Sequence, residues 1–97
     1  MKIHILIDHD VDSKSENYLT VFQTKKELIN GYIKLLFKYY PRHYHLTVKE
    51  LQFSTDEADK EMFKAFKKES YDESLIDLEE YFNKYDCSWS YHVKFFE

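Results

Sequence analysis

The sequence predicts a small α+β protein with a mostly antiparallel sheet of about four strands and three helices, in the order β-β-α-β-α-α-β. Two patterns predict this class. Some segments alternate apolar and polar residues with the period of a β-strand, and others repeat apolar residues at the three- and four-residue spacing of a helix. The chain has 97 residues, 43% of them hydrophobic and 33% charged, which predicts one globular domain over residues 1–97.

Strands are expected where short runs are rich in aromatic and β-branched residues. The last of these runs places Trp89, Tyr91, Val93 and Phe95 on one face. The third alternates until Glu50, where its parity changes as it would at a β-bulge. The four expected strands are 2–8, 18–23, 44–53 and 89–96.

Helix starts are indicated by three capping boxes, in which a hydroxyl and a Glu three residues later satisfy the first N–H groups of a helix. The boxes run from Thr24 to Glu27, from Ser54 to Glu57 and from Ser70 to Glu73. Pro41 is expected to end the first helix. Asn30-Gly31 is also typical of a hairpin turn, but helical spacing on both sides favours a helix. The expected helices are 25–39, 56–68 and 72–85.

The first strand presents two different faces. Ile3, Ile5 and Ile7 share one of them, and burying each side chain contributes about 1.5–3 kcal/mol, so this face is expected to point inward. The opposite face, which carries His4, Leu6, Asp8 and Asp10, is then expected to lie in water at a solvated strand end.

Carboxylates at a strand end also hold Mg²⁺ in phosphoryl-transfer enzymes. A small metal-dependent nuclease or phosphotransfer enzyme that uses Asp8, Asp10 and nearby histidines is therefore the alternative function. The single glycine excludes a glycine-rich phosphate loop. We expect no catalytic residue, metal or cofactor.

Histidine and cysteine offer two weaker candidates for chemistry. His43 and His45 lie two apart on an expected strand, and a zinc site with His92 would require the two strands to pair. Cys87 follows Asp86, whose negative charge disfavours a reactive thiolate. Exposed histidines and a structural thiol are the expected outcomes.

The overall charge and composition indicate which kind of partner and which cellular compartment to expect. The net charge is −4 and only one basic residue is Arg, so direct binding of nucleic acid is not expected. One cysteine suits a reducing compartment, and no segment reads as a membrane span or a signal peptide. A cytoplasmic protein is predicted.

Charge is distributed unevenly, because residues 55–86 contain eleven acidic residues and five lysines. One interpretation is that these acids stabilise helix N-termini and a solvated face. The other is an acidic face with tyrosine anchors that docks on a basic surface of another protein. The candidate partner-binding residues are Asp56, Glu57, Asp59, Glu61, Glu69, Asp72, Glu73, Asp77, Glu79, Glu80, Tyr71 and Tyr81.

Residues 1–53 resemble small uncharacterised proteins of low-GC bacteria and their phages. The resemblance rests on the strand that ends in acids, on Val21, Phe22, Thr24, Lys26 and Glu27, and on the segment "LTVKEL". It departs at Leu28-Ile29, where those proteins have a small residue, and it assigns no functional residue. In size, charge and composition the chain is also similar to the phage-encoded inhibitors of host defence called anti-CRISPR proteins.

The sequence therefore favours a non-enzymatic protein-binding module. The resemblance implies a phage or mobile-element inhibitor whose acidic face occupies the basic, nucleic-acid-binding surface of a host protein. An immunity protein or antitoxin would use the same acidic surface on a different partner. The identity of the partner and the oligomeric state stay open.

Overall fold

The computed structural model describes residues 1–9 and 18–96. These residues form an α+β structure with a three-stranded antiparallel sheet and four α-helices, so the predicted class and the antiparallel sheet are confirmed. The predicted order β-β-α-β-α-α-β is wrong at its third strand. The elements are β1 (Lys2–Asp8), β2 (Tyr18–Phe22), α1 (Lys25–Tyr39), α2 (Pro41–Gln52), α3 (Glu57–Phe66), the short 3₁₀ helix η1 (Glu73–Leu75), α4 (Leu78–Tyr85) and β3 (Trp89–Phe95).

The chain divides into two compact units. One comprises residues 1–28 and 78–97, and the other comprises residues 29–77. The first contains the sheet and α4, and the second contains most of α1 together with α2, α3 and η1. A single domain over residues 1–97 stays a prediction.

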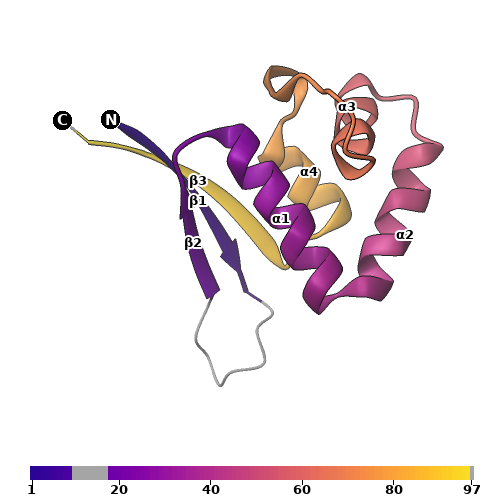
Figure 1. Cartoon of the computed structure of the whole chain (residues 1–97), viewed down its shortest axis with the longest axis horizontal. Helices are drawn as coiled ribbons and strands as arrows, with labels where there is room; N and C mark the ends of the chain where they lie inside the picture. The colour runs from indigo at the N-terminus through magenta and orange to yellow at the C-terminus, as the bar shows by residue number, and fades with distance from the viewer. Residues whose placement is uncertain (10–17, 97) are drawn as a thin grey trace. The chain divides into compact units, whose positions relative to one another are not determined.

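The sheet has the strand order β2-β1-β3, with both neighbours antiparallel to the central β1 (Figure 1). Its covered face is the opposite of the predicted one. His4, Leu6 and Asp8 are buried, whereas Ile3, Ile5 and Ile7 are only half-buried. Asp8 is 4% exposed, so the expectation that its carboxylate lies in water is wrong. Asp10 lies outside the described residues.

The register explains the inversion. Asp8, Leu6 and His4 are paired with Trp89, Tyr91 and Val93 of β3, so the largest side chains of that strand share their face. Helix α4 packs against β3 and adds Leu78 and Phe82, both buried. The isoleucine face instead carries Ser90, His92 and Lys94 from β3. The apolar side chains that β3 and α4 add to this face therefore outweigh the three isoleucines of β1.

Residues 44–53 were expected to form a strand, but helix α2 occupies 41–52. Tyr44, Thr47, Val48 and Leu51 follow the helical spacing of three, four and seven, and Thr47 and Leu51 are buried. Pro41 is the first residue of this helix, where its fixed φ and missing N–H are favourable. The change in alternation at Glu50, which the sequence suggested was a β-bulge, reflects the helical spacing of apolar residues in α2.

Helix α1 spans the predicted residues 25–39. Thr24 Oγ accepts the N–H of Glu27 at 3.1 Å, which is the first bond of the predicted capping box, and the Thr24 hydroxyl donates to the Glu27 carboxylate at 3.2 Å. Asn30-Gly31 lies inside this helix and not in a hairpin turn. Asn30 has a structural role there, because its Oδ1 accepts the hydroxyl of Tyr71 at 2.9 Å.

The two remaining predicted helices are shorter than expected. The segment 56–68 forms α3 over 57–66, and Asp56 rather than Ser54 caps it. The segment 72–85 is interrupted at Ile76, which follows η1 in the chain and precedes α4. This residue is extended and buried. Burial of Ile76 therefore prevails over the continuous helical pattern that the sequence shows from 72 to 85.

Candidate protein-binding surface

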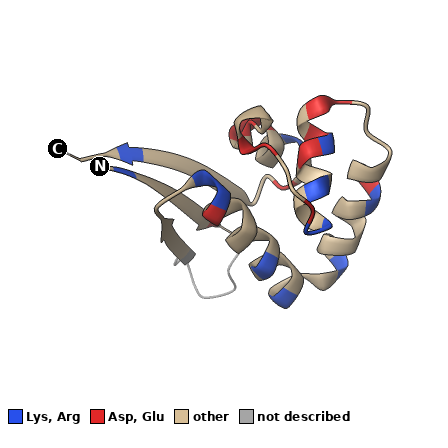
Figure 2. Ribbon diagram, turned by 45° about the horizontal axis from the view of Figure 1, so that its top comes forward, with Lys and Arg blue, Asp and Glu red and all other residues tan. Residues whose placement is uncertain are grey.

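The acidic residues of the unit 29–77, apart from Glu50 of α2, gather at α3 and on the segment that follows it. Figure 2 shows their red positions along these elements. The side chains of Asp56, Glu57, Glu69 and Asp72 are exposed, and that of Glu73 is half-exposed. We call these five residues the acidic surface. Residues 55–77 contain eight acidic and four basic residues, so the region has a net charge of −4.

A buried carboxylate holds the two parts of this surface together. Glu61 lies in α3, and its Oε1 accepts the backbone N–H of Asp72 at 2.9 Å. Its Oε2 accepts Lys64 Nζ, also at 2.9 Å. These two bonds, first the Asp72 N–H and then the lysine, lower the pKa of Glu61 below its usual value. Glu61 therefore fixes the segment around Asp72 against α3.

Two further carboxylates order the backbone at the surface itself. Asp56 accepts the N–H of Ala58 at 2.8 Å and caps α3. Asp72 accepts the hydroxyl of Ser74 at 2.6 Å and its N–H at 3.0 Å, and both bonds lower the pKa of Asp72. Both carboxylates are held in defined positions.

Lys64 interacts electrostatically with three of the acidic residues. The pKa of Lys64 is raised, first by its hydrogen bond to Glu61 and by the charge of Glu61, and further by the charges of Glu69 and Glu57. Residues before and after α3's last turn therefore act on the same ammonium group. With eight acidic residues against four lysines, residues 55–77 keep a negative excess.

The structure places four of the candidate partner-binding residues in the interior. Asp59 is buried and accepts the hydroxyl of Ser54 at 2.6 Å, and Glu61 has the structural role described above. Tyr71 is buried, and this burial together with the charge of Glu73 raises its pKa to about 12. Tyr81 is buried in α4. None of these four side chains offers a contact surface to a partner.

Three other candidates are exposed but lie outside the acidic surface. Glu79 and Glu80 occupy the first turn of α4, in the unit that contains the sheet. Asp77 is the last residue of the other unit. Negative charge at the first turn of α4 is favourable for the helix dipole, so these glutamates have a local role as well.

The alternative metal sites are not assembled in the part of the chain that is described. Among residues 1–9 and 18–96, no group of three or more His, Cys, Asp or Glu side chains is arranged to hold a metal ion. The strand pairing that would have brought His43 and His45 to His92 does not exist, because residues 41–52 are helical. On α2 the two histidines point in different directions, since His43 is half-buried and His45 is exposed.

The covered sheet face contains a polar pair in which His4 is buried and Tyr91 is half-buried. His4 Nδ1 and the hydroxyl of Tyr91 are hydrogen-bonded at 2.7 Å. Burial, and then the positive charges of Lys2 and Lys25, lower the pKa of His4. Burial and the charge of Glu79 raise the pKa of Tyr91. Both side chains are therefore neutral at physiological pH, which suits a structural pair between two strands.

Sequence reasoning missed one cluster, because it depends on strand register. The hydroxyl of Ser90 lies 2.7 Å from His9 Nε2 and 3.2 Å from His92 Nε2. Histidine can activate a serine by accepting its proton. Both imidazoles are exposed here, however, and water at an exposed site weakens the electrostatic stabilisation that acyl transfer needs. We therefore assign the cluster to the surface of the sheet.

Comparisons with protein-family models, with curated proteins and with solved structures each found no match for this chain. Among the described helices, none combines the length and the apolar character that crossing a bilayer requires. The α+β fold and the geometry of the surfaces are therefore the observations on which function is argued.

Proposed function

We propose that this chain is a non-enzymatic protein-binding module whose acidic surface docks on a basic surface of another protein. The observation that carries the proposal is the ordered group of carboxylates around Lys64 in the unit 29–77. A rigid negative surface favours association, because less side-chain and loop freedom is lost on binding. Complementary charge also accelerates encounter and selects the partner.

The partner class follows from the chemistry of the surface. The exposed carboxylates and a phosphate backbone are both rows of negative charge. Lysines and arginines arranged to bind a phosphate backbone would therefore also match these carboxylates. We therefore propose a nucleic-acid-binding protein of a host as the partner, with the chain acting as an inhibitor encoded by a phage or mobile element, like an anti-CRISPR protein. An immunity protein or antitoxin would use the same acidic surface to bind a different basic partner.

The experiment is affinity capture from a host lysate with the tagged chain, followed by identification of the retained proteins and elution with salt. The test variant is Glu57→Lys with Glu69→Lys, because both side chains are exposed and both act on Lys64. We expect this pair of reversals to weaken capture at least tenfold, and we expect increasing salt to elute the partner of the wild-type chain.

The matched control is Glu79→Lys with Glu80→Lys, which makes the same change in total charge on α4 in the other unit. The proposal predicts that this control reduces capture by no more than about threefold, as an effect of net charge. If the retained proteins bind the Glu57→Lys, Glu69→Lys variant as well as the wild-type chain, the acidic surface is not the docking site.

A further inference from the structure

The unit 29–77 has a second charged surface, of opposite sign. Between Glu27 and Glu50 the sequence contains no acidic residue, but it contains Lys34, Lys38, Arg42 and Lys49. All four side chains are exposed. Among the described residues, no carboxylate lies within 4.0 Å of any of the four cations. The net charge of +4 here equals in size the −4 of residues 55–77.

The cations lie on helix stripes that they share with exposed apolar and aromatic side chains. On α1 the stripe is Lys34, Phe37 and Lys38, and on α2 it is Arg42, His45, Leu46 and Lys49, both at spacings of three and four. Figure 2 shows the blue positions on these two helices. We call these residues, together with Tyr39, the basic aromatic surface.

Ring contacts join the two stripes. The ring of Phe37 lies 5.1 Å from that of Tyr44 and 6.5 Å from that of His45, both in edge-to-face geometry. Tyr44 in turn lies 5.3 Å from the buried Phe66 of α3, which anchors the cluster to the core. The aromatic part of the surface is therefore fixed on two packed helices and not on a loop.

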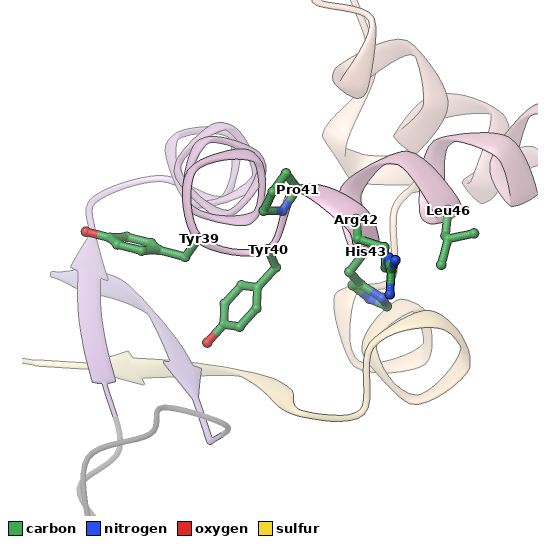
Figure 3. Close-up of a pocket in the computed structure, with 6 residues that line it drawn as sticks. All are labelled: Tyr39, Tyr40, Pro41, Arg42, His43 and Leu46. Carbon is green, nitrogen blue, oxygen red and sulfur yellow. The ribbon is translucent and has the colours of Figure 1, made fainter.

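The rings at this surface are unusually open to solvent. Phe37 is 56% and Tyr39 is 60% exposed, and Lys38 Nζ lies 5.2 Å from the centre of the Tyr39 ring. An open hollow of about 380 Å³ at the corner between the helices is lined by Tyr39 but not by Phe37. In Figure 3, Tyr39 and Tyr40 extend from the end of α1, whereas Arg42, His43 and Leu46 come from α2.

We propose that the basic aromatic surface binds single-stranded nucleic acid, with its cations on the phosphates and the ring of Tyr39, which lies beside Lys38, stacked on an unpaired base. Cations that track a backbone beside exposed aromatic rings are the arrangement used for single strands, because every base has a face that can stack. Lys34 and Lys38 lie one helical turn, about 6 Å, apart and can meet neighbouring phosphates. This surface is separate from the acidic surface, and the inference goes beyond the proposed function.

Two features favour a single strand over other anionic partners. Paired bases of a duplex offer no face to Tyr39, so a duplex would use the cations alone. The exposed ring of Tyr39 also favours a nucleic acid over an acidic protein, because every base has a face that can stack. The net charge of −4 made nucleic acid unexpected for the chain as a whole, but it describes the sum of two opposite surfaces.

The test is fluorescence anisotropy with a labelled oligothymidylate of about twelve nucleotides, which is long enough for one such surface. With about four phosphate contacts, affinity for a single strand should fall about 50-fold between about 50 and 200 mM salt. The variant Lys34→Gln, Lys38→Gln should weaken binding about tenfold and halve the salt slope. The matched control is Lys60→Gln, Lys67→Gln, which removes two exposed lysines from residues 55–77, the acidic half of the unit. It should leave the salt slope of binding unchanged.

The stacking part has its own pair of variants. Tyr39→Ala should weaken binding at least fivefold, and Tyr39→Phe, which keeps the ring, should bind like the wild-type chain. Circular dichroism confirms that each variant is folded. The Glu57→Lys, Glu69→Lys variant should retain oligonucleotide binding, so failure of the proposed function and failure of this inference give different results.

Four results would overturn the inference. One is no binding of the oligonucleotide at about 50 mM salt. The second is binding that Lys34→Gln, Lys38→Gln and Tyr39→Ala all leave unchanged. The third is equal competition by polyglutamate at the same charge, which would assign the surface to an acidic protein. The fourth is self-association, measured by sedimentation, in the absence of oligonucleotide binding. If Lys34→Gln, Lys38→Gln abolished that self-association, the basic aromatic surface would be assigned to binding the acidic half of a second copy.

Discussion

The two charged surfaces of the unit 29–77 differ in what their charged groups do inside the protein. On the basic aromatic surface, the four cations make no ion pair within the described chain. In the acidic half, Asp59 and Glu61 are buried, and Asp56 and Asp72 cap backbone N–H groups. Only part of the acidic charge is therefore available to a partner.

This difference shows why charge counts alone do not locate a binding surface. Eight acidic residues in 55–77 suggest a strong negative surface, but four of them are also structural. Four basic residues in 28–49 are fewer, yet each is exposed. Substitutions can therefore separate the structural groups from those that face a partner.

The largest effect is expected at the buried carboxylate of Asp59. Asp59→Ala removes the acceptor of the 2.6 Å bond from Ser54 at a site that is 5% exposed. We expect the free energy of unfolding to fall by about 2 kcal/mol, because hydrogen bonds to charged groups are the stronger ones. Urea unfolding measures it. The control Glu57→Ala, on the same helix but exposed, should change stability by less than about 0.5 kcal/mol, and equal losses would contradict the distinction.

Tyr71 comes next. Tyr71→Phe keeps the buried ring but removes the hydroxyl that donates to Asn30 Oδ1 at 2.9 Å. Stability should fall by about 1 kcal/mol, the usual net value of one such bond. Capture of the protein partner should stay unchanged, because the side chain is buried. Weaker capture by a folded Tyr71→Phe variant would instead support the tyrosine as an anchor.

A gain in stability is expected where α3 ends. The N–H of Glu69 bonds to Lys64 O and that of Lys68 to Ala65 O, which is the hydrogen-bond pattern that usually has Gly at the left-handed position. Here Lys68 occupies it with φ of 61°. Lys68→Gly should raise the free energy of unfolding by about 0.5 kcal/mol, since the strain of the Cβ is relieved at some cost in unfolded-state entropy. A loss of stability on thermal unfolding would show that Lys68 is not strained.

The last expected effect is on the pH dependence of stability to which Glu61 contributes. Its pKa is lowered in the folded chain, so its contribution to stability is present above the usual value of 4.5 and is lost as the pH falls through the lower, folded value. Between about pH 6 and pH 3, the urea midpoint of Glu61→Gln should therefore fall less than that of the wild-type chain. Equal falls would show that the bonds from Asp72 and Lys64 do not act on the ionised carboxylate.

Local patterns in the sequence were sufficient for several elements. The bounds of α1 follow from Thr24, Glu27 and the residues before Pro41, because caps and stops act within one turn. Strands β1 and β3 were found by alternation. The acidic residues that prove exposed, such as Glu57 and Glu69, were identified by charge alone.

The errors concern properties that depend on distant residues. The covered face of β1 is decided by its pairing with Trp89 and Tyr91, which lie more than eighty residues away in the sequence. Alternation in 44–53 competes with a helical stripe, and packing of Thr47 and Leu51 decides between them. The interior positions of Tyr71 and Tyr81 likewise depend on tertiary packing, since tyrosine suits both a core and an interface.

The most direct test of the acidic surface is residue-resolved amide hydrogen exchange of the chain, alone and in complex with its captured partner. The account predicts slower exchange in the complex over residues 56–60 and 69–74, with residues 34–49 unchanged. Slower exchange confined to other segments, with both acidic segments exchanging as in the free chain, would contradict it.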